Sequence, residues 1–316
     1  MPTVPRDRYS AEGAKSVDDW RAHLDRIGEE AGYFEPIGAR HHTFFNDLAP
    51  VLLVSFEELS SLRDAAADQM PLGYRVASAR GWSSLTIIAD GASWFRDRHL
   101  WGYFDRLIDE GFFEDFDRVA FYGAGMGGYA ASAYAVVAPG CRVLALAPRA
   151  TLDPATAPWD RRDLTARRLD FRSRYGFAPD MVAGTEATFL IHDPLQALDA
   201  AHAALFRGPQ VTHLRARHIG PDPAAALSRL DLLVPLIEAV VDGTISAALF
   251  HRLSRARRDD PAWLGRLAAR AQATGGAVRL ARACRAALAR SDHPRLRLLL
   301  AEAEAEIETE SDGGRA

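Results

Sequence analysis

Short apolar runs alternate with helical patterns over the first two thirds of the chain. Six runs are typical of strands buried on both faces, because each is short, continuous and bounded by turn-forming residues. They span residues 50–56, 85–89, 119–122, 142–146, 188–191 and 211–214. Helical patterns lie between several of them, at residues 98–110, 129–138 and 195–206. This alternation predicts an α/β protein, with a mostly parallel sheet covered by helices on both faces.

The two ends of the chain differ from this central part. Ser16, with Asp19 three residues later, predicts the start of an amphipathic helix of about fifteen residues, and strand signals follow from Tyr33. After about residue 225 the strand signals stop, and five helical patterns follow at 230–241, 245–257, 262–273, 278–289 and 296–308. We therefore predict a tail and helix over 1–34, with residues 1–16 disordered. An α/β domain over 35–245 follows, with a lid-like insert at about 150–182. A helical extension over 246–316 ends in a floppy tail from Ser311.

Composition narrows the class of protein. The 316 residues are 48% hydrophobic and 25% charged, as in ordinary soluble proteins, and two cysteines exclude a disulfide framework. We see no signal peptide and no apolar segment of the roughly 18–20 residues that a membrane span needs, so we expect a cytoplasmic protein without membrane contact. The net charge of −4 gives no footprint for nucleic acid. The adjacent His41 and His42, with His192, lack zinc-like spacing, so we expect no metal and no cofactor.

A glycine-rich turn follows the third apolar run, and it has two interpretations. Gly123, Gly125 and Gly128 satisfy G-x-G-x-x-G, in which glycines let the backbone approach a pyrophosphate at a helix N-terminus. The next strand ends at Leu146, where a ribose-binding carboxylate is expected. Arg149, which could meet a 2′-phosphate, follows there instead. This interpretation gives a Rossmann-like nucleotide-binding domain.

The second interpretation is a nucleophile elbow, G-x-S-x-G, in which small flanking residues let a sharp strand-to-helix turn close. Gly123 and Gly127 occupy the flanking positions, and Gly125 stands where the serine would be. The oxyanion-hole N–H groups would come from Met126 and from Phe56, in an expected loop after the early strand. Without a nucleophile, covalent acyl transfer has no first step.

The order of residues downstream favours the elbow. In this arrangement an acid and then a histidine follow the nucleophile along the chain. Asp193 follows the fifth apolar run and His218 follows the sixth. A helix cap at Leu195 for Asp193, and a packed loop histidine for His218, are the structural alternatives. Water activated by His218 is the route by which catalysis would survive without a serine.

Several segments resemble a group of bacterial proteins related to the α/β-hydrolase superfamily. They are residues 94–97, 121–154, 171–176, 192–194 and 201–206. The resemblance covers roughly residues 35–260. It implies an eight-stranded sheet, and hydrolysis of an ester, amide or thioester in members that keep the nucleophile. Gly125 departs from that pattern.

Some proteins of this group carry the name phosphoadenosine phosphosulfate reductase, a chemistry that the residues argue against. Such a reductase needs a nucleophilic cysteine in a C-terminal motif and a phosphate-binding serine-glycine loop. Cys284 lies within a predicted helix, between Ala283 and Arg285, where it is expected to pack.

Two further surfaces are candidates for binding. Arginines crowd the lid-like insert, where Arg172 and Arg174 would recognise an anionic substrate or partner, or else form a salt-bridged surface. The apolar stripes of the C-terminal helices would form a homo-oligomer, or pack within the chain. We therefore expect a hydrolase-like binding or scaffold protein that is non-catalytic or weakly catalytic, with an unidentified small molecule or protein as its partner. A hydrolase with a non-standard nucleophile and a nucleotide-binding domain are the alternatives.

Overall fold

The computed structural model describes residues 10–274, 276–290, 292 and 294–313. Its centre is one eight-stranded sheet, in the order β1-β2-β4-β3-β5-β6-β7-β8. The strands are β1 (Gly32–Ile37), β2 (His41–Asn46), β3 (Val51–Glu58), β4 (Ser83–Ala89), β5 (Arg118–Ala124), β6 (Arg142–Leu146), β7 (Ala187–His192) and β8 (Val211–Arg215). Pairing is antiparallel between β1 and β2 and between β2 and β4, and parallel from β4 through to β8. The six predicted runs are the six parallel strands, and the α/β prediction is confirmed.

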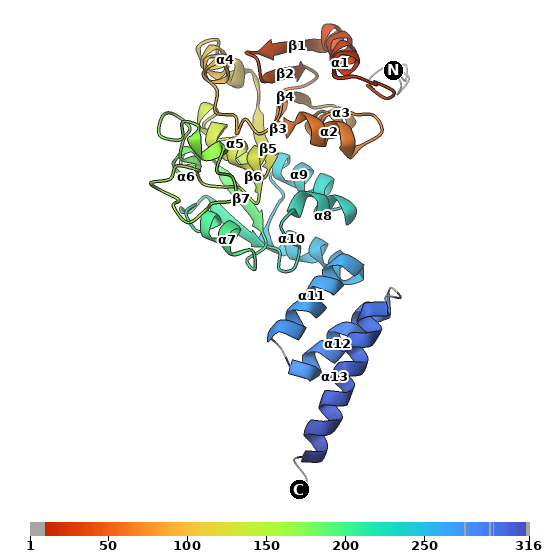
Figure 1. Cartoon of the computed structure of the whole chain (residues 1–316). Helices are drawn as coiled ribbons and strands as arrows, with labels where there is room; N and C mark the ends of the chain where they lie inside the picture. The colour runs from red at the N-terminus through yellow and green to blue at the C-terminus, as the bar shows by residue number, and fades with distance from the viewer. Residues whose placement is uncertain (1–9, 275, 291, 293, 314–316) are drawn as a thin grey trace.

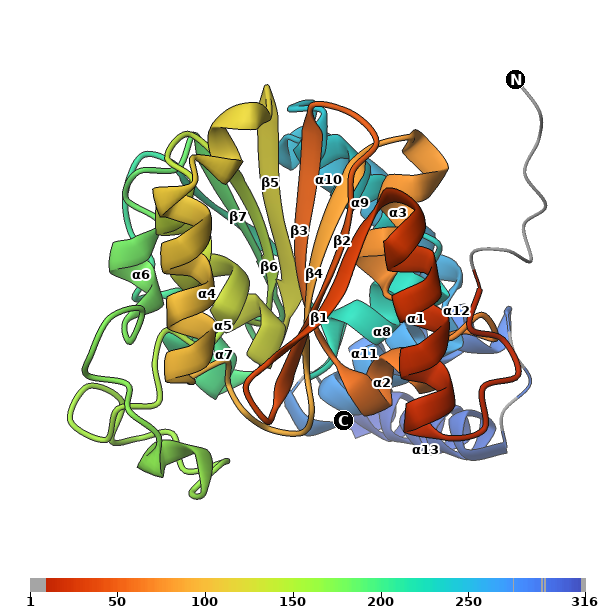
Figure 2. The ribbon, with the colours of Figure 1, turned by 90° about the horizontal axis from the view of Figure 1, so that it is seen from above.

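Helices cover both faces of the sheet (Figures 1 and 2). The helices of the α/β part are α1 (Val17–Ala31), α2 (Leu59–Ala65), α3 (Leu72–Arg80), α4 (Arg98–Asp109), α5 (Met126–Tyr134), α6 (Ala178–Met181), α7 (Ala197–Ala203), α8 (Pro223–Arg229), α9 (Leu233–Val241) and α10 (Ala247–Leu253). One core lies between the sheet and α4, α5 and α6, and a second lies between the sheet and α3, α8, α9 and α10. Both faces of the parallel strands are therefore buried, which explains their continuous apolar sequences.

The N-terminal helix follows its sequence signals. Ser16 and Asp19 form a capping box at the start of α1, and the buried side of the helix includes Trp20, Leu24 and Ile27. These three side chains pack in a separate core with Phe44 of β2. Part of the predicted disordered stretch, residues 1–9, lies outside the described residues, as do residues 314–316 of the predicted tail.

The C-terminal extension consists of α11 (Pro261–Thr274), α12 (Gly276–Leu288) and α13 (Pro294–Gly313), which have their own apolar core. Figure 1 shows the three helices projecting away from the sheet. The last helix runs to Gly313, so the floppy tail predicted from Ser311 is wrong for residues 311–313. The boundaries predicted at residues 35 and 246 stay predictions. Among the described residues, no helix has both the length and the apolar character to cross a membrane.

The first turn of α3 depends on a side chain that is distant in sequence. The Glu57 carboxylate, at the end of β3, accepts hydrogen bonds from the N–H groups of Leu72 (2.8 Å) and Gly73 (2.9 Å) and from the Ser55 hydroxyl (3.0 Å). Burial raises the pKa of this carboxyl.

Glu58, the next residue, caps α2 by accepting from the N–H groups of Ser60 and Ser61. The adjacent residues Glu57 and Glu58 therefore cap the N-termini of two different helices, α3 and α2.

We expect Glu57→Ala to lower the free energy of unfolding by about 2–3 kcal/mol, because it removes a carboxylate and leaves two helix N–H groups unpaired. Glu58→Ala, which opens an exposed cap, is the matched control and should cost about 1 kcal/mol. Urea unfolding of both variants measures the difference. Equal losses for the two variants would show that Glu57 is no more than a surface cap.

Candidate functional site

The predicted site residues follow three parallel strands of the sheet. Gly125 comes directly after β5, Asp193 after β7 and His218 shortly after β8. Because β5, β6, β7 and β8 are neighbours and all parallel, the chain leaves them at the same edge of the sheet. In open α/β sheets, ligands bind outside the carboxyl ends of the strands, so this edge is the candidate site.

Gly125 forms a sharp turn between β5 and α5. Its backbone angles are φ 55° and ψ −112°, and the residue is exposed. Its N–H donates to the Leu146 carbonyl of β6 (2.8 Å), and its carbonyl accepts from the Tyr129 N–H (3.0 Å), the first hydrogen bond of α5. The N–H groups at the start of α5 precede that bond, so the turn presents backbone donors at the edge of the sheet.

The glycines of this turn differ in how much space surrounds the position of a Cβ atom. A Cβ on Gly123 would lie 2.0 Å from the Gly127 carbonyl oxygen, and one on Gly127 would lie 2.2 Å from the Phe56 carbonyl oxygen. A Cβ on Gly128 would lie 2.9 Å from the Leu146 oxygen. A Cβ on Gly125 would have no atom within 4 Å. Packing therefore requires glycine at the flanking positions, whereas the position at the point of the turn has open space.

The loop after β4 covers one side of the elbow. The Trp94 N–H points at the Met126 sulfur (3.0 Å), and Trp94 and Phe95 have φ angles of 54° and 55°. Ala147 after β6 (φ 43°) and His218 after β8 (φ 63°) are also in this region. Non-glycine residues rarely adopt positive φ, and such strain concentrates at functional sites. Four of the seven non-glycine residues with positive φ in the described ranges lie in loops that leave this edge of the sheet.

The expected loop around Phe56 is wrong. Phe56 lies within β3, in register with Gly123 of β5 and Ile87 of β4, and the strand continues to Glu58. The strand continues because Glu57 and Glu58 stay paired with Ile88 and Ala89 of β4, while their carboxylates cap α3 and α2. The donor roles of Met126 and Phe56 stay predictions.

Asp193 is almost fully buried and holds two loops together. One carboxylate oxygen accepts from the Leu195 N–H (3.0 Å), and the other accepts from the Gly220 N–H (3.0 Å) in the loop after β8. The helix α7 begins later, at Ala197, with Gln196 as its N-cap residue. Asp193 thus makes a hydrogen bond to the Leu195 N–H, as the structural alternative expected, but it is not the N-cap residue of α7, and its side chain also joins the β7 and β8 loops.

His218 faces the C-terminal extension. Its ring packs edge-to-face on Trp263 of α11, with 6.0 Å between ring centroids, and its carbonyl accepts from Arg266 Nε (2.7 Å). Burial lowers the pKa of His218. The Asp193 charge opposes this shift, and Arg217 and Arg270 add to it. Within the described ranges, no hydrogen bond joins His218 to Asp193. The two residues are near enough for their charges to interact, but they do not form a hydrogen-bonded relay here.

A buried aspartate–histidine pair lies elsewhere at this edge, and sequence reasoning missed it. His202 Nε2 is 2.8 Å from Asp160 Oδ2, and Nδ1 accepts from the Ala150 N–H (3.2 Å). Since Nδ1 accepts, Nε2 carries the proton and donates it to Asp160. Burial opposes ionisation of Asp160, but hydrogen bonds from Arg162 and His202 outweigh it and hold the pKa well below its usual range. With both ring nitrogens engaged, His202 is a structural residue. Only its presence in a segment of family resemblance marked it in the sequence.

Arg149 connects this pair to the elbow. Its guanidinium lies 4.7 Å from the centre of the Trp94 ring and 3.6 Å from Asp160, and its buried Nη1 has no hydrogen-bond partner in the described ranges. Trp94 also donates from its indole N–H to Asp163 (3.0 Å). The side chain that the nucleotide interpretation reserved for a 2′-phosphate is therefore packed on an aromatic ring beside the elbow.

Both arginines predicted to recognise an anion, Arg172 and Arg174, are paired within the chain. Arg172 Nε is 3.1 Å from Asp153, and Arg174 forms an ion pair with Asp105. These contacts favour the salt-bridged alternative, while anion recognition by Arg172 and Arg174 stays a prediction. In the described part of the chain, no group of three or more His, Cys, Asp or Glu side chains could hold a metal ion.

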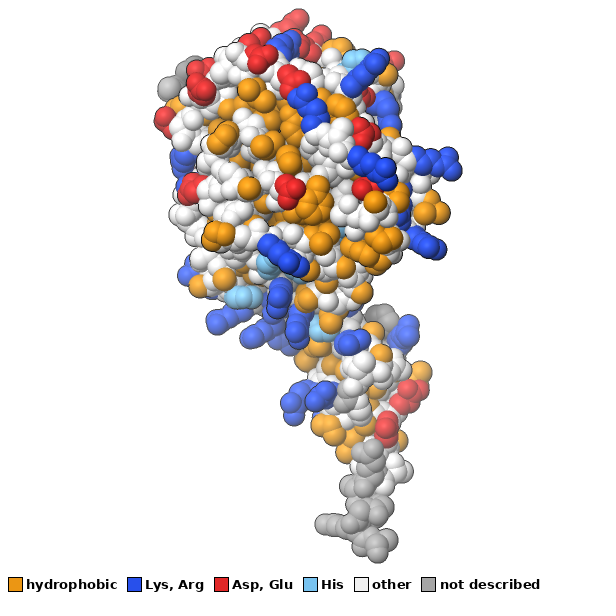
Figure 3. Space-filling view, turned by 90° about the vertical axis from the view of Figure 1, so that its left-hand side faces the viewer, with side chains coloured by type: hydrophobic (Ala, Val, Ile, Leu, Met, Phe, Trp, Pro, Cys, Tyr) orange, Lys and Arg blue, Asp and Glu red, His pale blue; other side chains and the backbone are white. Residues whose placement is uncertain are grey.

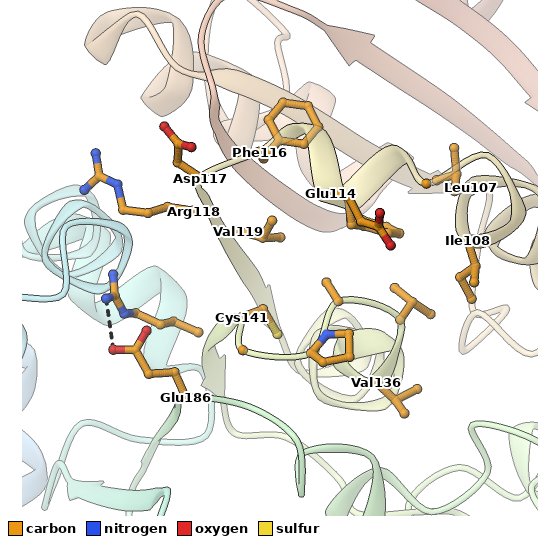
Figure 4. A pocket seen from close by; sticks show the side chains of 17 residues that line it. Leu107, Ile108, Glu114, Phe116, Asp117, Arg118, Val119, Val136, Cys141 and Glu186 are labelled. Atoms are coloured by element: carbon orange, nitrogen blue, oxygen red, sulfur yellow. Dashed lines mark hydrogen bonds and ion pairs between the residues drawn. The ribbon is translucent and has the colours of Figure 1, made fainter.

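A cavity of about 580 Å³ lies at the opposite edge of the sheet (Figure 4). It is lined by residues at the amino ends of β5 and β6, including Arg118 and Val119, and by Cys141 directly before β6. Arg142 and Glu186 form an ion pair at its wall (3.0 Å). Burial raises the pKa of the Cys141 thiol to about 12, so this thiol is not a nucleophile at neutral pH.

No protein-family model matches the chain, and no curated protein matches it by sequence. Among solved structures, an esterase of Pyrobaculum calidifontis is similar at 14% identity and a TM-score of 0.42, covering 78% of this chain and all of the esterase. Mouse alpha/beta hydrolase domain-containing protein 10 is similar at 13% identity and a TM-score of 0.42, covering 67% of this chain and 98% of the mouse chain. The capsule O-acetyltransferase of Neisseria meningitidis serogroup A is similar at 9% identity and a TM-score of 0.43, covering 64% and 94%.

At these identities no residue role passes from those proteins to this chain. The architecture is α/β-hydrolase-like on its own evidence: the eight-stranded sheet, the tight glycine turn after β5, and the loops after β7 and β8 at the same edge. The expected fold class is confirmed, together with its helical C-terminal extension.

The packing of the elbow predicts opposite outcomes for neighbouring glycines. We expect Gly127→Ala to cost at least about 3 kcal/mol of unfolding free energy, because its Cβ would overlap the Phe56 carbonyl. Gly125→Ala should cost only about 1–2 kcal/mol, the strain of a left-handed φ. Denaturant unfolding of the two variants measures both values. A larger loss for Gly125→Ala than for Gly127→Ala would contradict this account of the turn.

His41 contacts the loop after β4, in which Trp94 and Phe95 have positive φ angles. Its Nε2 is 2.7 Å from the Ser93 hydroxyl oxygen, which also accepts from the Phe95 N–H (3.1 Å). Burial lowers the pKa of His41 to about 4, against a weaker opposing effect of Asp97. In the unfolded chain this histidine titrates near 6.5.

Stability should therefore fall as the pH is lowered from about 6.5 to 4, because over that range the unfolded state binds a proton that the folded state does not. The contribution of His41 to this loss is at most about 3 kcal/mol. His41→Gln should flatten the dependence of the unfolding free energy on pH, and His251→Gln, at an exposed position of α10, is the control. If the two variants have the same pH dependence, His41 is not the residue that titrates.

Proposed function

We propose that this protein is a binding or scaffold protein on an α/β-hydrolase-like fold, with at most weak, non-covalent catalysis. The observation that carries the proposal is Gly125, a residue without a side chain at the exposed point of the elbow. A covalent acyl intermediate needs an oxygen, sulfur or nitrogen nucleophile at that point. Removing the nucleophile of a serine protease lowers kcat by about 10⁶-fold.

The surroundings of Asp193 and His218 support the same proposal. Both carboxylate oxygens of Asp193 accept backbone N–H groups, and the His218 ring packs on Trp263. A working relay needs the acid hydrogen-bonded to the histidine and the histidine within reach of the reacting proton. For His218 to form that hydrogen bond, its ring would have to leave Trp263.

The elbow still offers groups that bind ligands. The N–H groups at the start of α5 are suited to a carbonyl or carboxylate oxygen. Trp94 and Arg149 lie beside the turn. We infer that this edge binds a ligand with an oxygen directed at the turn, without forming a bond to it.

A serine-directed fluorophosphonate probe tests the proposal. We expect the wild-type protein to remain unlabelled and its hydrolysis of p-nitrophenyl acetate to equal the buffer rate. Gly125→Ser should fold, since its Cβ has open space and the positive φ adds a strain of only about 1–2 kcal/mol. It should gain less than about tenfold over buffer because no hydrogen bond joins Asp193 to His218.

Two further variants give the controls. His218→Ala removes the candidate base, whereas His213→Ala removes a histidine within β8 whose Nε2 lies near the Phe206 carbonyl. Labelling of the wild-type chain, or ester hydrolysis that His218→Ala abolishes and His213→Ala preserves, would overturn the proposal in favour of an active hydrolase.

A further inference from the structure

A groove runs between α11 and α12 in the C-terminal extension, and the loop after β8 closes one side of it. Its volume is about 470 Å³. Apolar side chains that line it include Leu267 and Ala271 of α11 and Ala283 of α12, and His218 lines it from the α/β part. The groove is separate from the elbow, and the inference does not depend on the missing nucleophile.

The charged side chains of the groove are all basic. Arg270, Arg279 and Arg282 line it and are exposed, and none of its described lining residues is acidic. Figure 3 shows arginines and histidines gathered where the α/β part meets the C-terminal helices. This surface is positive on a chain whose net charge is −4, so the charge is local.

The arginines of the groove differ from Arg285 and Arg290, the other arginines on α12 and just after it, in their ion pairing. Arg285 pairs with Glu304 of α13 (2.6 Å), and Arg290 pairs with Asp259 (2.5 Å). The three arginines of the groove form no ion pair with any residue in the described ranges. Glu304 and Asp259 thus neutralise the two arginines outside the lining of the groove, whereas the three arginines that line it have no ion pair among the described residues.

The positive charge extends to the end of the groove at His218. Arg266 of α11 donates to the His218 carbonyl, and its buried Nη2 has no partner in the described part of the chain. Burial lowers the pKa of His218, and Arg217, Arg270 and Arg266 lower it further, with Asp193 as the opposing charge. An anion at this end would relieve the mutual repulsion of these cations.

We propose that this groove binds a small anionic amphiphile, a molecule with one apolar chain and a carboxylate or phosphate head. The apolar chain lies on Leu267, Ala271 and Ala283, and Arg270, Arg279 and Arg282 bind the head. The volume lies in the range of small-molecule sites, about 300–1,000 Å³, which are apolar with a few convergent polar groups. Arginine matches the geometry of carboxylate and phosphate oxygens. Charge complementarity and size thus favour one small anion.

Titration calorimetry with dodecanoate, below the concentration at which it aggregates, tests the proposal on the full-length chain. We expect saturable binding of one dodecanoate per chain, and comparable binding of dodecyl phosphate. Dodecyltrimethylammonium, with the same chain and the opposite charge, should not bind. The charge-reversed double variant Arg270→Glu/Arg282→Glu should weaken dodecanoate binding at least tenfold, which corresponds to about 1.4 kcal/mol.

Arg295→Glu, at an exposed position of α13 outside the lining of the groove, is the matched control and should bind as the wild type does. If the double variant does not fold, the wild-type comparison of the anionic and cationic amphiphiles decides the question. Binding that is equal for both charges, or unchanged in a folded double variant, would overturn the proposal. The proposal would also be overturned if a glutamate-rich peptide bound and dodecanoate did not, or if the protein formed a dimer that the charge reversal abolished. In each case the groove would have a different occupant.

Discussion

The close approach of backbone to backbone at the turn after β5 is the constraint on which the rest of the site depends. Gly127 packs against the Phe56 carbonyl of β3, and Gly123 packs against the Gly127 carbonyl, so α5 lies directly on the sheet. A single methyl group at either position would force the helix away. Gly125 is under no such constraint of space. Space for a side chain therefore exists at the point of the turn, and only the positive φ of 55° favours glycine there.

Strand positions could be predicted from the sequence because burial on both faces makes a parallel strand continuously apolar. The sequence also put Gly125, Asp193 and His218 after predicted strands, and the parallel pairing of those strands brings the three residues to one edge of the sheet. Helix α3 was missed because its first turn is held by Glu57, which belongs to a strand fifteen residues earlier, while its own N-cap residue, Pro71, provides no side-chain cap. The end of β3 was misplaced for a different reason, because Glu57 and Glu58 are charged and resemble loop residues in sequence.

The site could be predicted in position but not in orientation. Chain order gives no information on where the His218 ring points, because that depends on α11, which lies more than forty residues later and packs against the ring through Trp263. The buried Asp160–His202 pair shows the same limit. Its partners come from the insert and from α7, and only the folded chain brings them within hydrogen-bond distance.

The loop after β8 is where the two parts of the protein meet, and its backbone determines what its histidine can do. The Arg217 carbonyl accepts from the Trp263 indole N–H (2.8 Å), and the His218 carbonyl accepts from Arg266. The Gly220 N–H donates to Asp193. The backbone of the loop is thus held from both sides, with His218 at φ 63°, and the His218 ring packs on Trp263. A hydrogen bond from the ring to Asp193 would require the ring to leave this contact. A histidine at the expected position along the chain is therefore not sufficient for a catalytic relay. Here the ring of that histidine packs on Trp263 of α11 and lines the groove.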